Sequence, residues 1–415
     1  MFRQNGIYRI RPAAGSEVSI AIAGDACPRE NNESYVQEHG REILEPIRPA
    51  LDAADIRIIQ WETVVSNTPN PIYKCGPHLR VAPETAHFLV DGKFDIALLA
   101  NNHTGDHGPE GILSTLQVLH QLGIKTAGAG INSDAASKAL HFEKNGLKFA
   151  LINACEMEFG TALPDRAGSN AMQEYQLPVQ IAAEKAAGNL VIVVIHGGNE
   201  YNPIPSPRMK NLYRAFAGAG ASLVMNIHPH CPQGIEVYHD VPIVYSPGNF
   251  FFPGKSAFDP SNFWWSGYLP KFTFDAAGVN TVEITPYYFT SDPLRITPLT
   301  GAARQWFLDY IDKISDLLLT DGDRLYDIWC ANKLGTMLNW IGNAPVAGLS
   351  ANPENEEALK AFPSVRHMMT CQSHNELVRN IMLLVEQKRI KTLLKQLPEL
   401  MELRTARFME QEEQK

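Results

Sequence analysis

Short apolar runs recur along the first 250 residues of the chain, and stretches with a helical pattern separate them. The runs are rich in β-branched residues and uniformly apolar, which is typical of strands buried on both faces. They lie at residues 17–23, 55–60, 94–100, 147–154, 190–196, 222–228 and 242–246. We therefore expect a buried sheet core in this part of the chain.

Two of the intervening stretches carry both the periodicity and the end signals of helices. In residues 109–123 apolar side chains recur on roughly one face, with Pro109 near the start and Gly123 near the end. Residues 207–220 open with Pro207 and close on glycines. Alternation of strands and helices predicts a layered α/β domain.

The pattern changes near residue 300. From Ala302 to Glu412 it is mostly helical, with a loop predicted at 343–356. We therefore divide the chain into an α/β domain at 1–300 and a helical extension at 301–415. The extension could cover the first domain or contact a partner, including a second copy of the chain in a homo-oligomer.

Composition narrows the class of protein. The chain has 415 residues, 45% hydrophobic and 20% charged, as expected of a protein that buries a core. A net charge of -9 does not indicate a nucleic-acid-binding surface, so we predict no nucleic-acid partner. Six scattered cysteines without a CxxC pair indicate reduced thiols. No run approaches the roughly 20 apolar residues of a membrane span, and the first residues lack the apolar stretch of a secretory signal, so we expect a cytoplasmic location.

Polar clusters stand where five of the apolar runs end. They read GDAC (24–27), WET (61–63), LLANNHTGDHG (98–108), HGGNEY (196–201) and NIHPH (226–230). In α/β sheets, ligands bind outside the carboxyl ends of the strands. We therefore expect the five clusters to converge on one place.

The side chains in these clusters suit a metal site. Carboxylates, an amide oxygen and imidazoles together favour Mn, Fe or Zn over Mg. Two divalent ions about 3.5–4 Å apart, bridged by one carboxylate, would clamp a phosphoryl group and generate a metal-bound hydroxide. The candidates are Asp25, Glu62, Asn102, His103, His196, His228 and His230.

Each of these residues also has a purely structural explanation when taken alone. Asp25 could cap a turn, and a lone histidine is more often hydrogen-bonded structure than a ligand. The HxH pair at 228–230 is more specific, because alternate residues of an extended segment point the same way. Five of the 13 histidines fall within the clusters, and this joint pattern favours a metal site.

The order of the motifs resembles the CapA family of capsule-synthesis proteins, also called the poly-γ-glutamate capsule or PGA_cap family, a branch of the calcineurin-like metallophosphatases. The resemblance covers roughly residues 17–298. YKCGPHLRVAP at 73–83 is similar to the family's connector after the glutamate. The other matching pieces are GD (24–25), WET (61–63), ANNHTGDHG (100–108), GAG (128–130), HGGNEY (196–201), HPHCPQ (228–233) and YSPGNF (245–250).

This resemblance implies a four-layer α/β/β/α sandwich with a dinuclear metal centre at one edge. By motif position the ligands would be Asp25, Glu62, Asn102, His196, His228 and His230, with Glu62 bridging the two ions. His103 would not bind metal but would stabilise developing charge or protonate the leaving group. Asp106 would orient His103 or tie down the turn.

The chain departs from the family pattern in three places. Cys27 stands where the wider superfamily has a histidine, and it could act as a thiolate ligand or as a small buried hydrophobe. Asn226 and Ile227 replace the start of GHHPH. Gly197 and Gly198 replace the aromatic step of HWGEY. These changes could alter the metal positions and the substrate wall.

Cations and aromatics near the clusters could bind substrate. Lys74, Arg80 and Arg208 suit phosphate or carboxylate recognition, although each could equally be an exposed salt-bridging residue. The aromatic run at 263–265 could line a pocket or pack in the core.

The sequence therefore favours a metal-dependent hydrolase, in the first place a phosphoesterase. Its substrate would be a small molecule or a polymer that carries phosphate or carboxylate groups. One alternative is a protein of capsule, poly-γ-glutamate or glycan biosynthesis that acts on the polymer or assists its synthesis. Another is a degenerate, non-enzymatic binding module.

Overall fold

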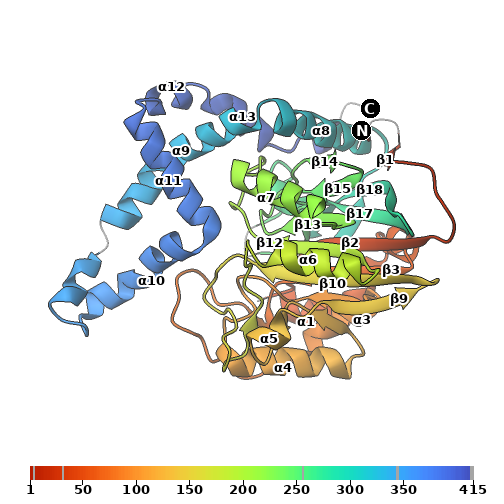
Figure 1. Cartoon of the computed structure of the whole chain (residues 1–415), viewed down its shortest axis with the longest axis horizontal. Helices are drawn as coiled ribbons and strands as arrows, with labels where there is room; N and C mark the ends of the chain where they lie inside the picture. The colour runs from red at the N-terminus through yellow and green to blue at the C-terminus, as the bar shows by residue number, and fades with distance from the viewer. Residues whose placement is uncertain (3–4, 30–31, 255–256, 343–344, 412–415) are drawn as a thin grey trace.

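The computed structural model arranges the chain in four α/β/β/α layers followed by a helical extension (Figure 1). This confirms the predicted fold class. The structure describes residues 1–2, 5–29, 32–254, 257–342 and 345–411.

The first sheet has the order β1-β18-β17-β2-β3-β6-β7, with β16 pairing β2 and β19 pairing β18. Strands β2, β3, β6 and β7 run parallel, so their carboxyl ends share one edge. The strands span β1 Ile7–Arg9, β2 Val18–Ala26, β3 Ile56–Trp61, β6 Ile96–Leu98, β7 Lys125–Ala127, β16 Asn249–Phe251, β17 Ser266–Asp275, β18 Gly278–Ser291 and β19 Leu294–Pro298.

The second sheet has the order β14-β15-β13-β12-β10-β9, and β10, β12, β13 and β15 are parallel. Two short ladders, β4-β5 and β8-β11, lie outside both sheets. The strands span β4 Val64–Val65, β5 Arg80–Val81, β8 Ala129–Gly130, β9 Leu140–Lys144, β10 Leu147–Cys155, β11 Gly168–Ser169, β12 Leu190–His196, β13 Leu223–Ile227, β14 Ile235–Tyr238 and β15 Val241–Val244.

Alternation along the strands builds the layers, because successive side chains point to opposite faces of a sheet. Ile58 of β3 and Ile192 of β12 belong to one buried cluster, the core between the sheets. Their neighbours Ile59 and Val193 face outward, onto α1, α3 and α4 on one side and α6 and α7 on the other. These helices span α1 Glu33–Leu44, α3 His87–Asp91, α4 Gly108–Gln121, α6 Leu177–Ala186 and α7 Pro207–Gly218, with the shorter α2 Arg48–Asp52 and α5 Ser133–Ala136 between them.

The helices predicted at 109–123 and 207–220 are present as α4 and α7, each ending two residues earlier than expected. The start of α7 shows why the sequence folds in this way. Pro207 occupies the first helical position, and the Ser206 hydroxyl accepts a hydrogen bond from the backbone N–H of Met209 at 3.2 Å.

The strands β17, β18 and β19 do not correspond to any predicted apolar run. In β18 buried and partly exposed residues alternate over most of its length, and β17 contains Pro270 and Lys271. A search for uniformly apolar runs finds strands covered on both faces and misses strands that alternate. Together with β2 they extend the first sheet in an antiparallel manner.

Helices dominate the chain after residue 300, as predicted. The predicted loop at 343–356 contains a short 3-10 helix at Pro345–Ser350, and 343–344 lie outside the described residues. The helices span α8 Gly301–Thr320, α9 Gly322–Gly342, α10 Glu356–Thr370, α11 Gln372–Glu386, α12 Ile390–Leu394 and α13 Leu397–Leu403.

The helical extension packs on the α/β layers at one end and extends away from them at the other. Phe307 and Ile311 of α8 are buried in the same cluster as the inter-sheet residues, whereas α10 lies farther out (Figure 1). The division at residue 300 stays a prediction. Among the described residues, no helix combines the length and the apolar character needed to cross a membrane.

Candidate metal centre

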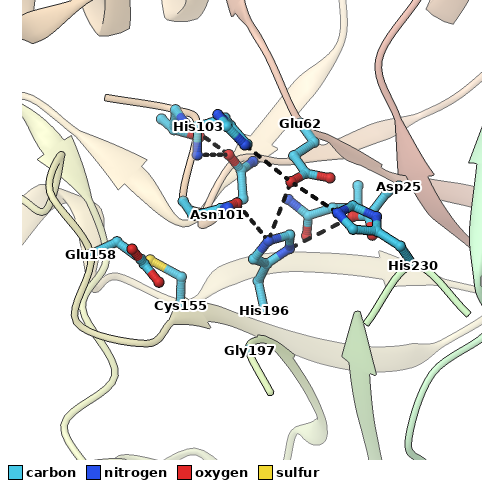
Figure 2. Close-up of polar contacts among 12 residues, drawn as sticks. Asp25, Glu62, Asn101, His103, Cys155, Glu158, His196, Gly197 and His230 are labelled. Carbon is cyan, nitrogen blue, oxygen red and sulfur yellow. Dashed lines mark hydrogen bonds and ion pairs between the residues drawn. The ribbon is translucent and has the colours of Figure 1, made fainter. Parts of the chain in front are cut away.

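Side chains from both sheets meet where parallel strands end. Asp25 lies at the end of β2, Glu62 directly follows β3, and His196 ends β12. Figure 2 shows these three side chains and His230 pointing toward one another. The predicted convergence of strand ends is therefore present for this group.

The distances within the group suit two adjoining ligand sets. His196 Nδ1 lies 3.6 Å from Asp25 Oδ1, and its Nε2 lies 3.7 Å from Glu62 Oε1. His230 Nε2 lies 4.0 Å from the same Glu62 oxygen. One set is Asp25, Glu62 and His196, the other is Glu62, His228 and His230, and within each set the ligand atoms lie within 4.8 Å of one another. Glu62 is common to both sets.

Unpaired buried atoms show that these residues fit a cation. Both carboxylate oxygens of Asp25 and both of Glu62 are buried without a hydrogen-bond partner among the described residues. The Nδ1 atoms of His196 and His228 are in the same state. Buried polar atoms are almost always paired, because leaving one unpaired costs about 1–3 kcal/mol. Divalent metal ions would satisfy all of these atoms at once.

Burial and neighbouring charges shift the pKa values of Glu62 and His196 in opposite directions. Burial, followed by the charge of Asp25, raises the pKa of Glu62 well above its usual value. Burial, followed by the nearby His228 and His230, lowers the pKa of His196 well below its usual value. A neutral imidazole is the form that binds metal.

An asparagine that the sequence analysis did not single out orients His230. The side-chain amide of Asn249 donates to the carbonyl oxygen of Trp264 at 3.0 Å, so its own oxygen faces His230 Nδ1 at 2.8 Å. His230 Nδ1–H therefore donates to Asn249, and Nε2 keeps its lone pair for a ligand. The only sequence signal for Asn249 is its place in the motif YSPGNF.

The backbone after β13 explains how His228 and His230 reach the centre. The strand ends at Ile227, and the two histidines have φ of 118° and 54°. The expectation that they alternate on an extended segment is therefore wrong. Non-glycine residues adopt such angles at a cost of order 1–3 kcal/mol, and residues strained in this way cluster at functional sites.

The segment after β6 is fixed by Asn101, a residue left unassigned by the sequence. The Asn101 side-chain oxygen accepts hydrogen bonds from the backbone N–H groups of His103 and Thr104, at 3.0 and 2.8 Å. Its amide donates to the carbonyl oxygen of Trp61 at 2.9 Å, which joins this segment to the end of β3. Asn102 is thereby presented to His196, whose Nε2–H donates to the Asn102 side-chain oxygen at 3.0 Å.

His103 lies at the edge of the centre with one nitrogen facing inward. Its Nε2 is 3.9 Å from Glu62 Oε1, and its Nδ1 is 2.6 Å from Asp106 Oδ2. Lys74 contacts the other oxygen of Asp106 and is nearly fully buried. Burial lowers the pKa of His103; the Asp106 charge opposes this effect and Lys74 adds to it. The predicted pairing of His103 with Asp106 is thus present in the structure.

The three predicted substrate-binding cations occupy different surroundings. Lys74 forms an ion pair with Asp106, and Arg80 donates a hydrogen bond to the carbonyl oxygen of Ser66 at 2.5 Å. Arg208 forms ion pairs with three carboxylates, those of Glu156, Glu174 and Glu376. The Arg208 contacts join α7 to α11 and give no support to a role in substrate binding.

Cys27 packs as a small buried hydrophobe. It belongs to the cluster under α1 and α3. Burial raises the pKa of its thiol well above the usual value, which disfavours a thiolate. Within the described residues, no group of potential metal ligands includes it.

Of the aromatic run at 263–265, the middle residue faces the centre. The ring of Trp264 lies 4.8 Å from that of His230 and 6.1 Å from that of Tyr201, centroid to centroid. Phe263 and Trp265 are buried in the two main core clusters. One residue of the run therefore borders the centre, and the other two pack in the core.

The family model and two relatives that match this chain are named for capsule or PGA synthesis. Residues 19–254 match the family described as bacterial capsule synthesis protein PGA_cap. Over 252 residues the chain is 29% identical to the PGA biosynthesis protein CapA of Bacillus subtilis, covering 59% of this chain and 66% of that protein. It is 26% identical over 260 residues to the capsule biosynthesis protein CapA of Bacillus anthracis, covering 60% and 63%. The chain thus matches less than two thirds of either relative.

A more distant relative and two solved structures complete the comparison. A probable polyglutamine synthesis accessory protein of Mycobacterium tuberculosis is 22% identical over 277 residues, covering 63% of this chain and 73% of that protein. A hypothetical protein from Thermus thermophilus has a TM-score of 0.42 and 14% identity, with coverage of 65% and 99%. A putative 5'-nucleotidase from Staphylococcus aureus has a TM-score of 0.40 and 12% identity, with coverage of 72% and 58%.

Proposed function

The chain belongs to the PGA_cap family of bacterial capsule synthesis proteins, and from this premise we propose that it is a metal-dependent hydrolase that acts on phosphoesters. One observation carries the proposal. Four carboxylate oxygens of Asp25 and Glu62 are buried without partners among the described residues, within reach of histidines from neighbouring strand ends. Burying two carboxylates in this way is costly, and a bound cation would offset that cost.

The proposed centre would hold two divalent ions, Mn, Fe or Zn, and Glu62 belongs to both candidate ligand sets. When bound, these ions would act as Lewis acids on the phosphoryl oxygens and lower the pKa of a coordinated water. Imidazole and carboxylate donors together suit these metals. The proposed ligands are Asp25, Glu62, Asn102, His196, His228 and His230.

In this proposal the residues beside the centre assist departure of the leaving group. His103 Nε2 faces the centre, where a proton on it can pass to the departing oxygen. Asp106 holds the opposite nitrogen and stabilises the imidazolium, while Lys74 neutralises the second Asp106 oxygen. The Asp106 charge raises the pKa of His103 and the Lys74 charge lowers it. Together they set how readily His103 releases its proton.

Hydrolysis of p-nitrophenyl phosphate and bis(p-nitrophenyl) phosphate tests the proposal. Protein stripped with a chelator and reloaded separately with Mn²⁺, Fe²⁺ or Zn²⁺ is expected to hydrolyse at least one ester, and the stripped protein is not. Metal-loaded protein that hydrolyses neither ester contradicts a phosphoesterase.

The names of the relatives favour a second candidate, in which the chain acts on a carboxylate-bearing polymer or assists its synthesis. Incubating the metal-loaded protein with poly-γ-glutamate and following chain length by gel electrophoresis separates the two. Shortening of the polymer without release of p-nitrophenol from the esters favours the second candidate.

The orienting role proposed for Asp106 predicts a selective loss of turnover. Asp106→Asn is expected to lower kcat by about 10–100-fold, as is typical for residues that orient a functional histidine. Metal content should not change, because Asp106 lies outside both ligand sets. Equal kcat in wild type and Asp106→Asn, measured on metal-loaded protein, would refute the role.

A second copy of the chain is the partner proposed for the helical extension. Large apolar side chains are exposed on α10 and α11, among them Phe362, Met369, Met382 and Val385. Met382→Glu combined with Val385→Glu is expected to lower the molar mass measured by light scattering from that of an oligomer to that of one chain. A wild-type mass equal to one chain contradicts this partner.

A further inference from the structure

A second group of metal-binding side chains lies in the helical extension. His367 and His374 flank Cys371, the residue at which α10 passes into α11. The spacing H-x3-C-x2-H brings the three side chains to one side of this junction. One ligand atom from each lies within 4.8 Å of the others.

The surroundings of His367 resemble those of a metal-bound histidine. Its Nε2 lies 2.8 Å from Glu158 Oε2, and its Nδ1 faces the Cys75 sulfur at 3.7 Å. Histidines that bind metal through one nitrogen usually donate the other N–H to a carboxylate. Glu158 lies in this position as the ion-pair partner of Nε2, and Nδ1 faces the cysteine.

His374 has a buried nitrogen that nothing in the described residues satisfies. Its Nδ1 has no hydrogen-bond partner, and its ring is nearly perpendicular to that of His367, with centroids 4.3 Å apart. A cation bound between these two imidazoles would give the unpaired nitrogen of His374 a partner and would offset the cost of burying it.

We propose that His367, Cys371 and His374 form a site for a transition metal of the Zn²⁺ class, with Cys75 beside it, its sulfur 3.7 Å from His367 Nδ1. A thiolate and two imidazoles are ligands that zinc prefers, and a water molecule would complete the tetrahedron. Binding requires the Cys371 thiol to lose its proton, which passes to solvent. Cys371 now donates its thiol proton to Glu156 at 3.2 Å, and the metal would replace that proton.

The site would connect the helical extension to the proposed catalytic residues. Cys75 follows Lys74, whose ammonium group contacts Asp106 beside His103. Glu158 precedes Phe159 and Gly160, and the Gly160 backbone lies against Gly105, where an added Cβ would stand 2.2 Å from the Gly160 Cα. A metal at this junction would hold α10 and α11 against the segments that position His103.

Titration of the stripped full-length protein with Co²⁺ tests the site. Thiolate-to-cobalt charge transfer gives a near-ultraviolet absorption that oxygen and nitrogen ligands do not. The proposed ligands around Glu62 include no thiol, so this band reports on the second site alone. We expect wild type to show the band, and Cys371→Ser and His374→Ala to lose it together with about one equivalent of metal per chain.

Two control variants make the assignment specific. His228→Ala alters the centre at Glu62 and is expected to keep the band. Cys330→Ala removes another buried thiol, on α9, and should also keep it. Wild type saturated with Co²⁺ but without the band overturns the proposal and leaves an ordinary ion pair of His367 with Glu158. This wild-type measurement decides the matter even if a variant fails to fold.

Discussion

Replacing His103 with glutamine is expected to lower kcat for phosphoester hydrolysis by about 10²–10⁴-fold, the contribution typical of a positioned general acid. Glutamine retains hydrogen bonding to Asp106 but cannot carry a transferable proton. Metal content should stay at the wild-type level, because His103 is in neither ligand set. Steady-state kinetics on protein of measured metal content checks both parts.

A matched control separates this effect from general damage. His120 lies exposed on α4, and His120→Gln is expected to leave kcat unchanged. If His103→Gln loses metal along with activity, His103 is a ligand and not the proton donor. If kcat is unchanged, the proposed role of His103 is wrong.

Glu62→Gln is expected to weaken metal binding by more than about 100-fold, beyond the loss typical for residues that only orient a ligand. Glu62 belongs to both ligand sets, so its replacement affects both ions. Activity should fall below detection at metal concentrations that saturate wild type. Equilibrium dialysis followed by elemental analysis measures the binding.

The same substitution should stabilise the metal-free protein. Glu62 and Asp25 are buried together without partners among the described residues, and replacing one of two adjacent carboxylates by a neutral amide removes repulsion and desolvation cost. The Tm of stripped Glu62→Gln is therefore expected to exceed that of stripped wild type, and the order should reverse once metal is added to both. A Glu62→Gln protein that is less stable in the stripped state would indicate a purely structural glutamate.

The sequence predicts the strands that lie between two covered faces with good accuracy. The run at 190–196 coincides with β12, because every residue of this strand is buried. The long strands β17 and β18 are absent from the predictions because polar, proline and partly exposed positions interrupt their apolar pattern. Patterning therefore finds the centre of the sandwich more readily than its edge.

The proposed ligands could be selected from the sequence because each lies at the end of a recognisable strand or a few residues after it. The residues that hold them could not, since their partners come from distant segments. Asn249 orients His230 across 19 positions, and Asn101 reaches back 40 positions to Trp61. Neither side chain has a local pattern that reveals such a contact.

The helical extension shows the same limit. Arg208 is a predicted substrate-binding cation, but two of its carboxylate partners lie 34 and 168 positions away. The spacing of His367, Cys371 and His374 is visible in the sequence but is not among the predicted sites. Only the packing of Cys75 and Glu158 against it gives that spacing a chemical meaning.

The most direct test of the central claim is an anomalous-difference map from crystals grown with Mn²⁺ and phosphate. We expect two peaks among Asp25, Glu62, Asn102, His196, His228 and His230, with the Glu62 carboxylate between them and phosphate on the side of His103. A map without any peak in this group, from protein saturated with Mn²⁺, would contradict the claim.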